Sequence, residues 1–317
     1  MIASGPSAPP AVSNLGAPHA SMAAGLPRLH LLAALLVMAV WGSNFVIIRI
    51  ALDSFPPLLL AALRYTFAFF PAVLLLKRPN VPWRNLAAYG VLIGGGQFGL
   101  LFIAMKADIT PGLASLVVQT QVIFTILFSL LLHKERVRLF QMAALALALA
   151  GLGVILTHTD GHTTPLGIAL VIGAAISWSS GNMVSRAAGQ VNMLAYVVWA
   201  SLFAIPPLFA LAFLMEGSDK IFQSLAQAGP GPWAAVAWQA VGNTMFGYGI
   251  WGWLLSRHPA AQVAPLAMLV PVFGMMSSTL ILGEPLQGWK ILAALLVMGG
   301  LMISILWPTI SKNLNWR

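Results

Sequence analysis

Apolar residues run along the chain in long stretches that short polar segments separate. The stretches cover residues 30–51, 56–76, 84–105, 111–132, 139–157, 165–187, 193–215, 233–255, 260–282 and 289–307. Each one is long enough to cross about 30 Å of hydrocarbon as an α-helix. The pattern therefore predicts an all-α membrane protein with ten transmembrane helices.

Composition agrees with this prediction. Apolar residues make up 59% of the chain and charged residues 7%, and the mean hydropathy is +0.89. Soluble domains of this length do not have such values. Residues 1–27 contain no lysine or arginine and no apolar run long enough for a signal peptide, so we expect a disordered N-terminal tail there.

Basic residues set the expected orientation, because cytoplasmic loops are enriched in them. With the N-terminus in the cytoplasm, the inner side carries Arg28, Lys77, Arg78, Arg84, Lys134, Arg136, Arg138, Arg186, Arg257, Lys312 and Arg317. The outer side then carries Arg49, Lys106, Lys220 and Lys290. We therefore expect both termini to be cytoplasmic. The net charge of +9 follows from this topology and forms no basic face, so nucleic acid is not an expected partner.

Landmark residues recur in the same order in the two halves of the chain. Trp41 and Arg49 are eight residues apart, and so are Trp178 and Arg186. Further pairs are Phe98-Gly99 with Phe246-Gly247, Pro111 with Pro259, Glu135 with Glu284, and Gly151 with Gly300. Five spans per copy is an odd number, so the copies cross the membrane in opposite directions, which is typical of transporters. Chance similarity between apolar helices is the alternative.

The repeat gives the expected division of the chain. A first five-helix repeat covers residues 28–158 and a second covers 165–308. Residues 309–317 are expected to form a cytoplasmic C-terminal tail.

Uncharged polar and aromatic residues gather near the middle of six expected helices. Counted at about 1.5 Å per residue, this level holds side chains of the first, third, fourth, sixth, eighth and ninth helices. The candidate substrate-binding residues are Trp41, Asn44, Gln97, Gln119, Gln121, Trp178, Asn182, Asn243, Tyr248, Pro265, Met268 and Pro271. Their convergence predicts a shared polar cavity. For each residue taken singly, the alternative is a hydrogen bond between neighbouring helices.

Two prolines interrupt the ninth expected helix, in the stretch QVAPLAMLVP from Gln262 to Pro271. A proline removes one backbone donor from a helix, so we expect Pro265 and Pro271 to free the carbonyls of Ala261 and Ala267. Hydrocarbon tolerates a free carbonyl only where protein or a water-filled cavity meets it. The fourth helix, the repeat counterpart, is expected to supply side-chain amides instead.

Charged residues are nearly absent from the expected spans. Arg64 lies about two turns into the second helix, and we expect its side chain to reach outward to solvent rather than to contact a substrate carboxylate. No acid lies at mid-depth, so a facilitated or weakly coupled cycle is favoured over proton or sodium coupling. Glu135 and Glu284 are expected to cap or gate the ends of the fourth and ninth helices.

The sequence has no arrangement typical of an enzyme. Cysteine is absent, and the six histidines lie in the tail, at helix ends or in connections. His158 and His162 have the spacing of a metal-binding pair but flank a Thr-Asp-Gly connection, so neither a metal nor another cofactor is expected. A lipid-modifying enzyme needs reactive pairs at one headgroup level, for which the inner loops offer only His133, Glu135 and His258.

Several motifs are similar to those of a known family. They are AVWGSNFVIIRIALDSFPPLLLAALR near the start, GLASLVVQTQVIFTI at 112–126, AISWSSGN at 175–182, YGIWG at 248–252 and QVAPLAMLVPVFG at 262–274. Over residues 30–307 the chain resembles the EamA-type transporters of the drug/metabolite transporter superfamily. The resemblance implies a ten-helix inverted repeat in the bacterial inner membrane and export of small metabolites, often amino acids. It also implies a cavity between helices 1, 3, 4, 6, 8 and 9.

We therefore expect an inner-membrane exporter of small amino-acid metabolites, such as cysteine, O-acetylserine or other neutral amino acids, that works by alternating access. Its partners are the small-molecule substrate and the lipid bilayer, and the sequence is compatible with a monomer. A broad-specificity exporter of drugs or purines is the alternative within transport. A sensor or scaffold has no need of a polar layer centred on the repeat.

The residue types suggest how a zwitterion is held. Side-chain carbonyls of Asn44, Gln97 or Gln121, together with the freed backbone carbonyls, are expected to meet its ammonium group. Donors from Trp41, Trp178, Asn182 or Asn243 are expected to meet its carboxylate. An uncharged cavity suits a molecule without net charge, because an unpaired ion there costs several kcal/mol.

Overall fold

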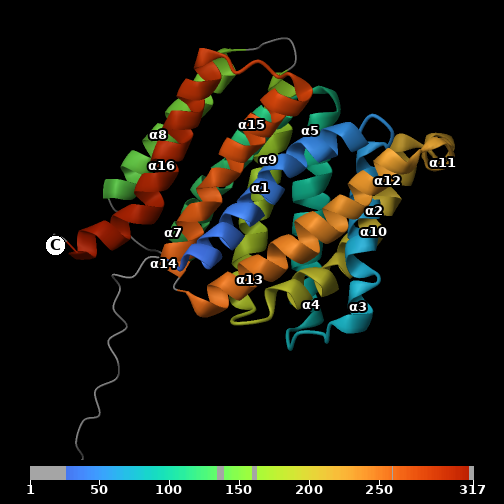
Figure 1. Ribbon diagram of the computed structural model, residues 1–317, viewed down its shortest axis with the longest axis horizontal. Coiled ribbons are helices and arrows are strands. Elements are labelled where there is room, and N and C mark those ends of the chain that lie inside the picture. The colour runs from blue at the N-terminus through green and yellow to red at the C-terminus, as the bar shows by residue number, and fades with distance from the viewer. Residues whose placement is uncertain (1–25, 134–138, 159–162, 259, 314–317) are drawn as a thin grey trace, which may run out of the picture.

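The computed structural model describes residues 26–133, 139–158, 163–258 and 260–313. Within these ranges the chain forms helices and connections, and no strand (Figure 1). The prediction of an all-α protein is therefore confirmed. The predicted N-terminal tail lies outside the described residues apart from Leu26 and Pro27.

The helical elements follow the order of the apolar stretches. They are α1 (Arg28–Ala51), α2 (Pro57–Phe69), α3 (Ala72–Leu75), α4 (Trp83–Gly90), η1 (Val91–Gly99), α5 (Leu100–Ala107), α6 (Pro111–Val117), η2 (Val118–Thr120), α7 (Gln121–His133), α8 (Leu139–Thr157), α9 (Pro165–Ala187), α10 (Met193–Glu216), α11 (Ser218–Gln227), α12 (Pro230–Ala237), η3 (Trp238–Phe246), α13 (Gly247–Arg257), α14 (Ala260–Val263), η4 (Ala264–Met268), α15 (Leu269–Leu282) and α16 (Gly288–Asn313).

Eight helical stretches within the described ranges are long and apolar enough to cross a membrane. They are Arg28–Ala51, Pro57–Leu75, Trp83–Ala107, Pro111–Phe128, Leu139–Thr157, Pro165–Ala187, Met193–Glu216 and Ala264–Leu282. A shorter apolar stretch, Gly288–Ser304, lies in α16. The expected span 233–255 is also helical, within α12, η3 and α13. By length and composition, the chain is a multi-pass membrane protein.

Three boundaries differ from the prediction. The second expected helix stops at Phe69, because Pro71 has no N–H to continue the ladder, and the short helix α3 follows. The expected connection 216–232 contains helix α11, which buries Ile221 and has Asp219 in its first turn, where a carboxylate favours the helix dipole. Helix α16 continues to Asn313, beyond the predicted start of the tail at 309.

Four segments depart from α-helical geometry. The π-helices η1 and η3, of nine residues each, lie inside the third and eighth expected helices. The 3₁₀-helices η2 and η4 lie inside the fourth and ninth. The prediction of an interruption in the ninth helix is confirmed, whereas the other three interruptions were not predicted. Departures of this kind are frequent at functional sites.

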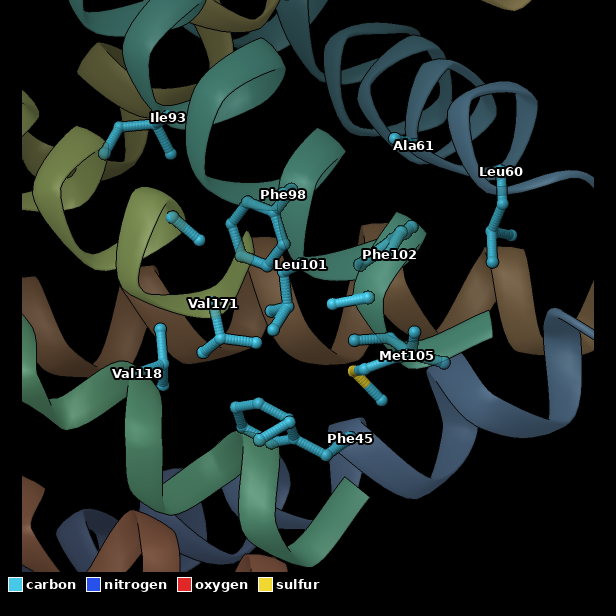
Figure 2. Packing of buried hydrophobic residues seen from close by; sticks show 14 of the residues in the cluster. Phe45, Leu60, Ala61, Ile93, Phe98, Leu101, Phe102, Met105, Val118 and Val171 are labelled. Atoms are coloured by element: carbon cyan, nitrogen blue, oxygen red, sulfur yellow. The ribbon is translucent and has the colours of Figure 1, made fainter. Parts of the chain in front are cut away.

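The helices pack so that the first half of the chain interleaves with the second. Helix α2 packs on α10, α8 on α16, α1 on α15, and α9 on η1, α5 and α7. In Figure 1, α8 and α16 lie along one edge of the molecule and α2 and α10 along the opposite edge, with α1, α9, α13 and α15 between them. Figure 2 shows part of the buried apolar packing, including Phe45, Phe98, Leu101 and Met105. The candidate site lies among these central helices.

Candidate functional site

A cavity of about 290 Å³ lies among the central helices. Its walls come from both halves of the chain, mainly from α1, η1, η2 and α7 in the first and from α9, η3, α13 and η4 in the second. Among the described residues that line it, none carries a charged side chain. The cavity thus combines polar and aromatic groups without a net charge of its own.

The fold brings most of the predicted site residues together. The cavity is lined by Trp41, Asn44, Gln97, Gln119, Gln121, Trp178, Asn182, Asn243, Tyr248 and Met268. Pro265 and Pro271 are not among the lining residues, although Ala267 and Val270 beside them are. The contact of these side chains with a substrate remains a prediction.

Trp41 connects α1 to the π-helix η3. Its indole Nε1 donates a hydrogen bond to the backbone carbonyl of Asn243, at 3.0 Å. Its ring lies 5.4 Å from that of Tyr248 and 5.5 Å from that of Trp251, measured between centroids. In this structure the N–H that we expect to meet a substrate carboxylate is bonded to this carbonyl, and its contact with a substrate remains a prediction. The ring itself remains on the cavity wall.

Gln121 joins α7 to α9. Asn182 donates through Nδ2 to Oε1 of Gln121 at 3.1 Å, and Ser179 donates through Oγ to the Gln121 backbone carbonyl at 2.5 Å. The alternative of a bond between neighbouring helices therefore holds for this amide pair. By contrast, Oδ1 of Asn44, a residue 3% exposed, has no hydrogen-bond partner among the residues that the structure describes.

The interruption between the two prolines is a 3₁₀ turn. Backbone N–H groups at the C-terminal end of this turn donate to the carbonyls of Leu266 and Ala267. The prediction that Pro271 leaves the carbonyl of Ala267 free is therefore wrong, because the tighter turn supplies another donor. The fourth helix places the side-chain amides of Gln119 and Gln121 on the cavity wall, and η2 interrupts it without any proline. That Pro265 frees the carbonyl of Ala261 remains a prediction.

Arg64 does not reach solvent, and the prediction of an outward-reaching side chain is wrong. The residue is 2% exposed, and its Cζ lies 3.6 Å from the centre of the Phe98 ring. Its Nε and Nη1 atoms have no hydrogen-bond partner in the described part of the chain. Burying an unpaired guanidinium costs several kcal/mol, and a desolvated cation–π contact offsets about 2 kcal/mol of this cost.

Some lining residues were not predicted. Tyr89, Phe98, Met193, Trp251 and Leu301 all line the cavity. Trp251 follows Tyr248 by about one helical turn, which is a signal in the sequence. Leu301 belongs to α16 and gives no such signal, because an apolar residue in an apolar helix does not reveal which neighbour it meets.

Glu284 caps a helix of the other half of the chain. Its carboxylate accepts from Thr110 Oγ1 at 2.5 Å, from the Gly112 backbone N–H at 3.1 Å and from Lys290 Nζ at 3.1 Å, and also from Ser278 Oγ. It thus neutralises the N-terminus of α6, in agreement with a capping role. Its repeat partner Glu135 lies outside the described residues.

Metal-binding geometry is not found in the described part of the chain, which contains no group of three histidine or carboxylate side chains suited to a metal ion. The ring of His158 stacks on Trp289, with centroids 5.4 Å apart. His133 is described only as part of α7, and His162 lies outside the described residues.

Comparison with known proteins fits this architecture. The profile of the EamA-like transporter family matches residues 28–157 and again residues 165–306. A probable amino-acid metabolite efflux pump of Salmonella typhimurium is 41% identical over 278 residues, covering 86% of this chain and 93% of that protein. A protein of the same description from Escherichia coli K12 is 38% identical, covering 90% and 95%.

Two further comparisons agree. The uncharacterized inner membrane transporter YedA of Escherichia coli K12 is 28% identical, covering 91% of this chain and 92% of that protein. A solved crystal structure shares the fold with a TM-score of 0.61 at 22% identity, covering 88% of this chain and 96% of that one. The chain therefore belongs to the EamA-like transporter family, as a multi-pass transporter of the inner membrane and not an enzyme.

Proposed function

We propose that the protein exports small neutral amino-acid metabolites by alternating access around the central cavity. The observation that carries the proposal is the cavity wall, which combines amide side chains from both halves with no charged side chain among its described residues. A zwitterion has no net charge and matches such a wall, since an isolated ion would be expensive there. The descriptions of the relatives, probable amino-acid metabolite efflux pumps, support the same substrate class.

The size of the cavity favours small substrates. Its volume of about 290 Å³ lies at the lower end of the range of about 300–1,000 Å³ that is usual for pockets holding drug-sized ligands. Cysteine, O-acetylserine and other neutral amino acids are therefore favoured over bulky compounds.

We infer specific roles for two groups of residues. The unpartnered Oδ1 of Asn44 and the side-chain carbonyl of Gln97 are suited to the ammonium group. The rings of Trp41, Tyr248 and Trp251 form an aromatic cluster on the same wall, and such faces attract a cation. These contacts hold the ammonium group of the substrate, and its carboxylate requires a different partner.

An inverted repeat of ten helices is part of the proposal, with repeats over 28–158 and 165–308, both termini cytoplasmic and a tail over 309–317. Corresponding interruptions support it: π-helices η1 and η3, and 3₁₀-helices η2 and η4. Corresponding contacts support it too, since α1 packs on α15 and α13 as α9 packs on α7 and η1. The two separate family matches point the same way.

Efflux from proteoliposomes tests the function. Vesicles that contain the protein and are loaded with labelled cysteine, O-acetylserine or phenylalanine are expected to lose at least one of these substrates faster than protein-free vesicles with the same load. Absence of flux for every amino acid would overturn the proposal.

A broad exporter of drugs or purines is the second candidate. It is favoured by one observation, the number of aromatic residues on the wall, which include Trp41, Phe98, Trp178, Tyr248 and Trp251. Competition in the same vesicles separates the two candidate functions. A drug or purine exporter is expected to show efflux that planar ring compounds inhibit and cysteine does not.

Introduced cysteines test the topology, because the chain has none of its own. Ser218 and Asn80 are both exposed and lie at opposite ends of the helices in the proposed orientation. In intact cells, an impermeant maleimide is expected to label Ser218→Cys and not Asn80→Cys. The reverse pattern would contradict cytoplasmic termini.

A further inference from the structure

Arg64 is a buried cation without a counter-ion among the described residues. Its side chain comes from α2 and is 2% exposed. The described acids are engaged at helix ends: Asp53 with Arg49, Asp108 with Thr164, Glu216 with the N-terminus of α2, Asp219 with Ser218, and Glu284 with the N-terminus of α6. None of them pairs with Arg64. Ionisable residues buried in membrane proteins are costly and are characteristic of substrate pathways.

Arg64 lines a small cavity next to the central one. This second cavity, of about 10 Å³, is lined by Arg64, Tyr65, Tyr89, Thr244 and Tyr248, among others. It has about the room that one water molecule, or one carboxylate oxygen, requires.

The two cavities share part of their walls. Tyr89 and Tyr248 line both of them. Phe98, whose ring lies against the guanidinium, lines the central cavity directly after Gln97 in η1. Arg64 is therefore in contact with a residue that lines the proposed substrate site.

We propose that Arg64 binds the carboxylate of the exported amino acid, an inference that rests on the proposed function. One carboxylate oxygen enters the small cavity and accepts hydrogen bonds from the guanidinium, whose Nε and Nη1 lack partners. The ammonium group stays in the central cavity, beside the amides and the aromatic cluster. Arg64 then supplies the one positive charge of the site and selects substrates that carry a carboxylate.

Tryptophan fluorescence provides a binding assay that does not depend on transport, because Trp41, Trp178 and Trp251 line the cavity. Purified protein is titrated with cysteine and phenylalanine and with their carboxamides, which keep the ammonium group and lose the negative charge. The wild type is expected to bind the acids about tenfold or more tightly than the amides. Arg64→Gln is expected to bind acid and amide alike, and Arg64→Lys to keep part of the preference.

Arg49→Gln is the matched control. It removes the same charge from an exposed pair with Asp53 and is expected to leave the preference for acids unchanged. Retention of the full preference in Arg64→Gln, or its absence from the wild type, would overturn the assignment. So would equal binding of acid and amide together with displacement by chloride, which would identify a small inorganic anion at Arg64.

A second measurement uses the wild type alone and covers the case in which Arg64→Gln does not fold. Acetate is expected to displace bound cysteine, whereas acetamide at the same concentration is not; equal effects would again overturn the assignment.

Efflux from proteoliposomes distinguishes the assignment of Arg64 from the proposed export function. If the wild type prefers acids but shows no flux, the assignment of Arg64 stands and the export function is rejected. If flux is present but Arg64→Gln keeps the full preference for acids, the export function stands and the assignment of Arg64 is rejected.

Discussion

The indole N–H of Trp41 is bonded to the backbone carbonyl of Asn243, and Gly247 makes this contact sterically feasible. A β-carbon placed on Gly247 would lie 2.2 Å from Nε1 of Trp41. The first helix of one half of the chain is thereby fixed to a π-helix of the other half at the cavity wall.

Gly247→Ala is expected to displace the Trp41 ring and to break its bond to Asn243. We expect a changed tryptophan emission spectrum, a lower melting temperature in detergent and slower amino-acid efflux. Gly249→Ala is the matched control, since its β-carbon would meet only Leu194 Cδ2, at an ordinary 3.7 Å. Equal behaviour of the two variants would show that the tight contact with Trp41 is unimportant.

Asn44→Leu is expected to separate function from stability. The Oδ1 atom of Asn44 is buried without a partner, so its removal should leave the free energy of unfolding unchanged or raise it by about 1 kcal/mol. Binding of cysteine and phenylalanine should nevertheless weaken by about tenfold, because an acceptor for the ammonium group is lost.

Asn85→Leu provides the contrast. Asn85 donates to the Val184 carbonyl at 2.8 Å and accepts from Tyr196 Oη at 2.7 Å. Its replacement should therefore lower the free energy of unfolding by about 2–4 kcal/mol. Chemical unfolding in detergent measures both variants. A loss of stability in Asn44→Leu as large as in Asn85→Leu would indicate a purely structural role for Asn44.

Pro271→Ala is expected to slow efflux more than it lowers stability. Alanine restores a backbone donor, which allows the 3₁₀ turn Ala264–Met268 to become α-helical. Since the two helix types differ by about 20° per residue, five residues rotate Met268 by roughly 100° relative to the preceding helix. Pro206→Ala, at an exposed position in α10, serves as the control. Similar efflux in both variants would indicate that the 3₁₀ turn is a feature of helix packing without a role in transport.

Glu284→Gln is expected to lower the free energy of unfolding by about 2 kcal/mol or more, because a buried carboxylate that accepts several hydrogen bonds is replaced by an amide. Asp53→Asn should change it by less than about 1 kcal/mol, since surface ion pairs contribute little. The side chains of Lys290 and Glu284 are 2% and 9% exposed, against 35% and 67% for Arg49 and Asp53. Thermal unfolding compares the variants, and equal shifts would contradict the capping role.

Sequence reasoning located the cavity because the membrane makes depth along a helix readable. The distances of Asn44, Gln97 and Asn243 from the helix ends predict a common level, and in the fold all three line one cavity. Polar residues in apolar segments are few, so a level at which they coincide is informative. The all-α class follows from the length of the apolar stretches.

Side-chain partners were less predictable, because they depend on which neighbour a helix face meets. Position alone does not show that the N–H of Trp41 is taken by Asn243 or that Asn182 binds Gln121. The burial of Arg64 depends on Phe98, a residue of another helix. The interruption η2 contains no proline, so the local sequence does not predict it.

Two carboxylates cap helix N-termini at the expected outer face, where a transported molecule leaves the protein. Glu216 accepts from the N–H groups of Leu58 and Leu59 at the start of α2, as Glu284 does from Gly112 at the start of α6. Free helix N-termini retain anions. With both positions filled by the protein's own side chains, these two helix N-termini are not available to bind a departing carboxylate.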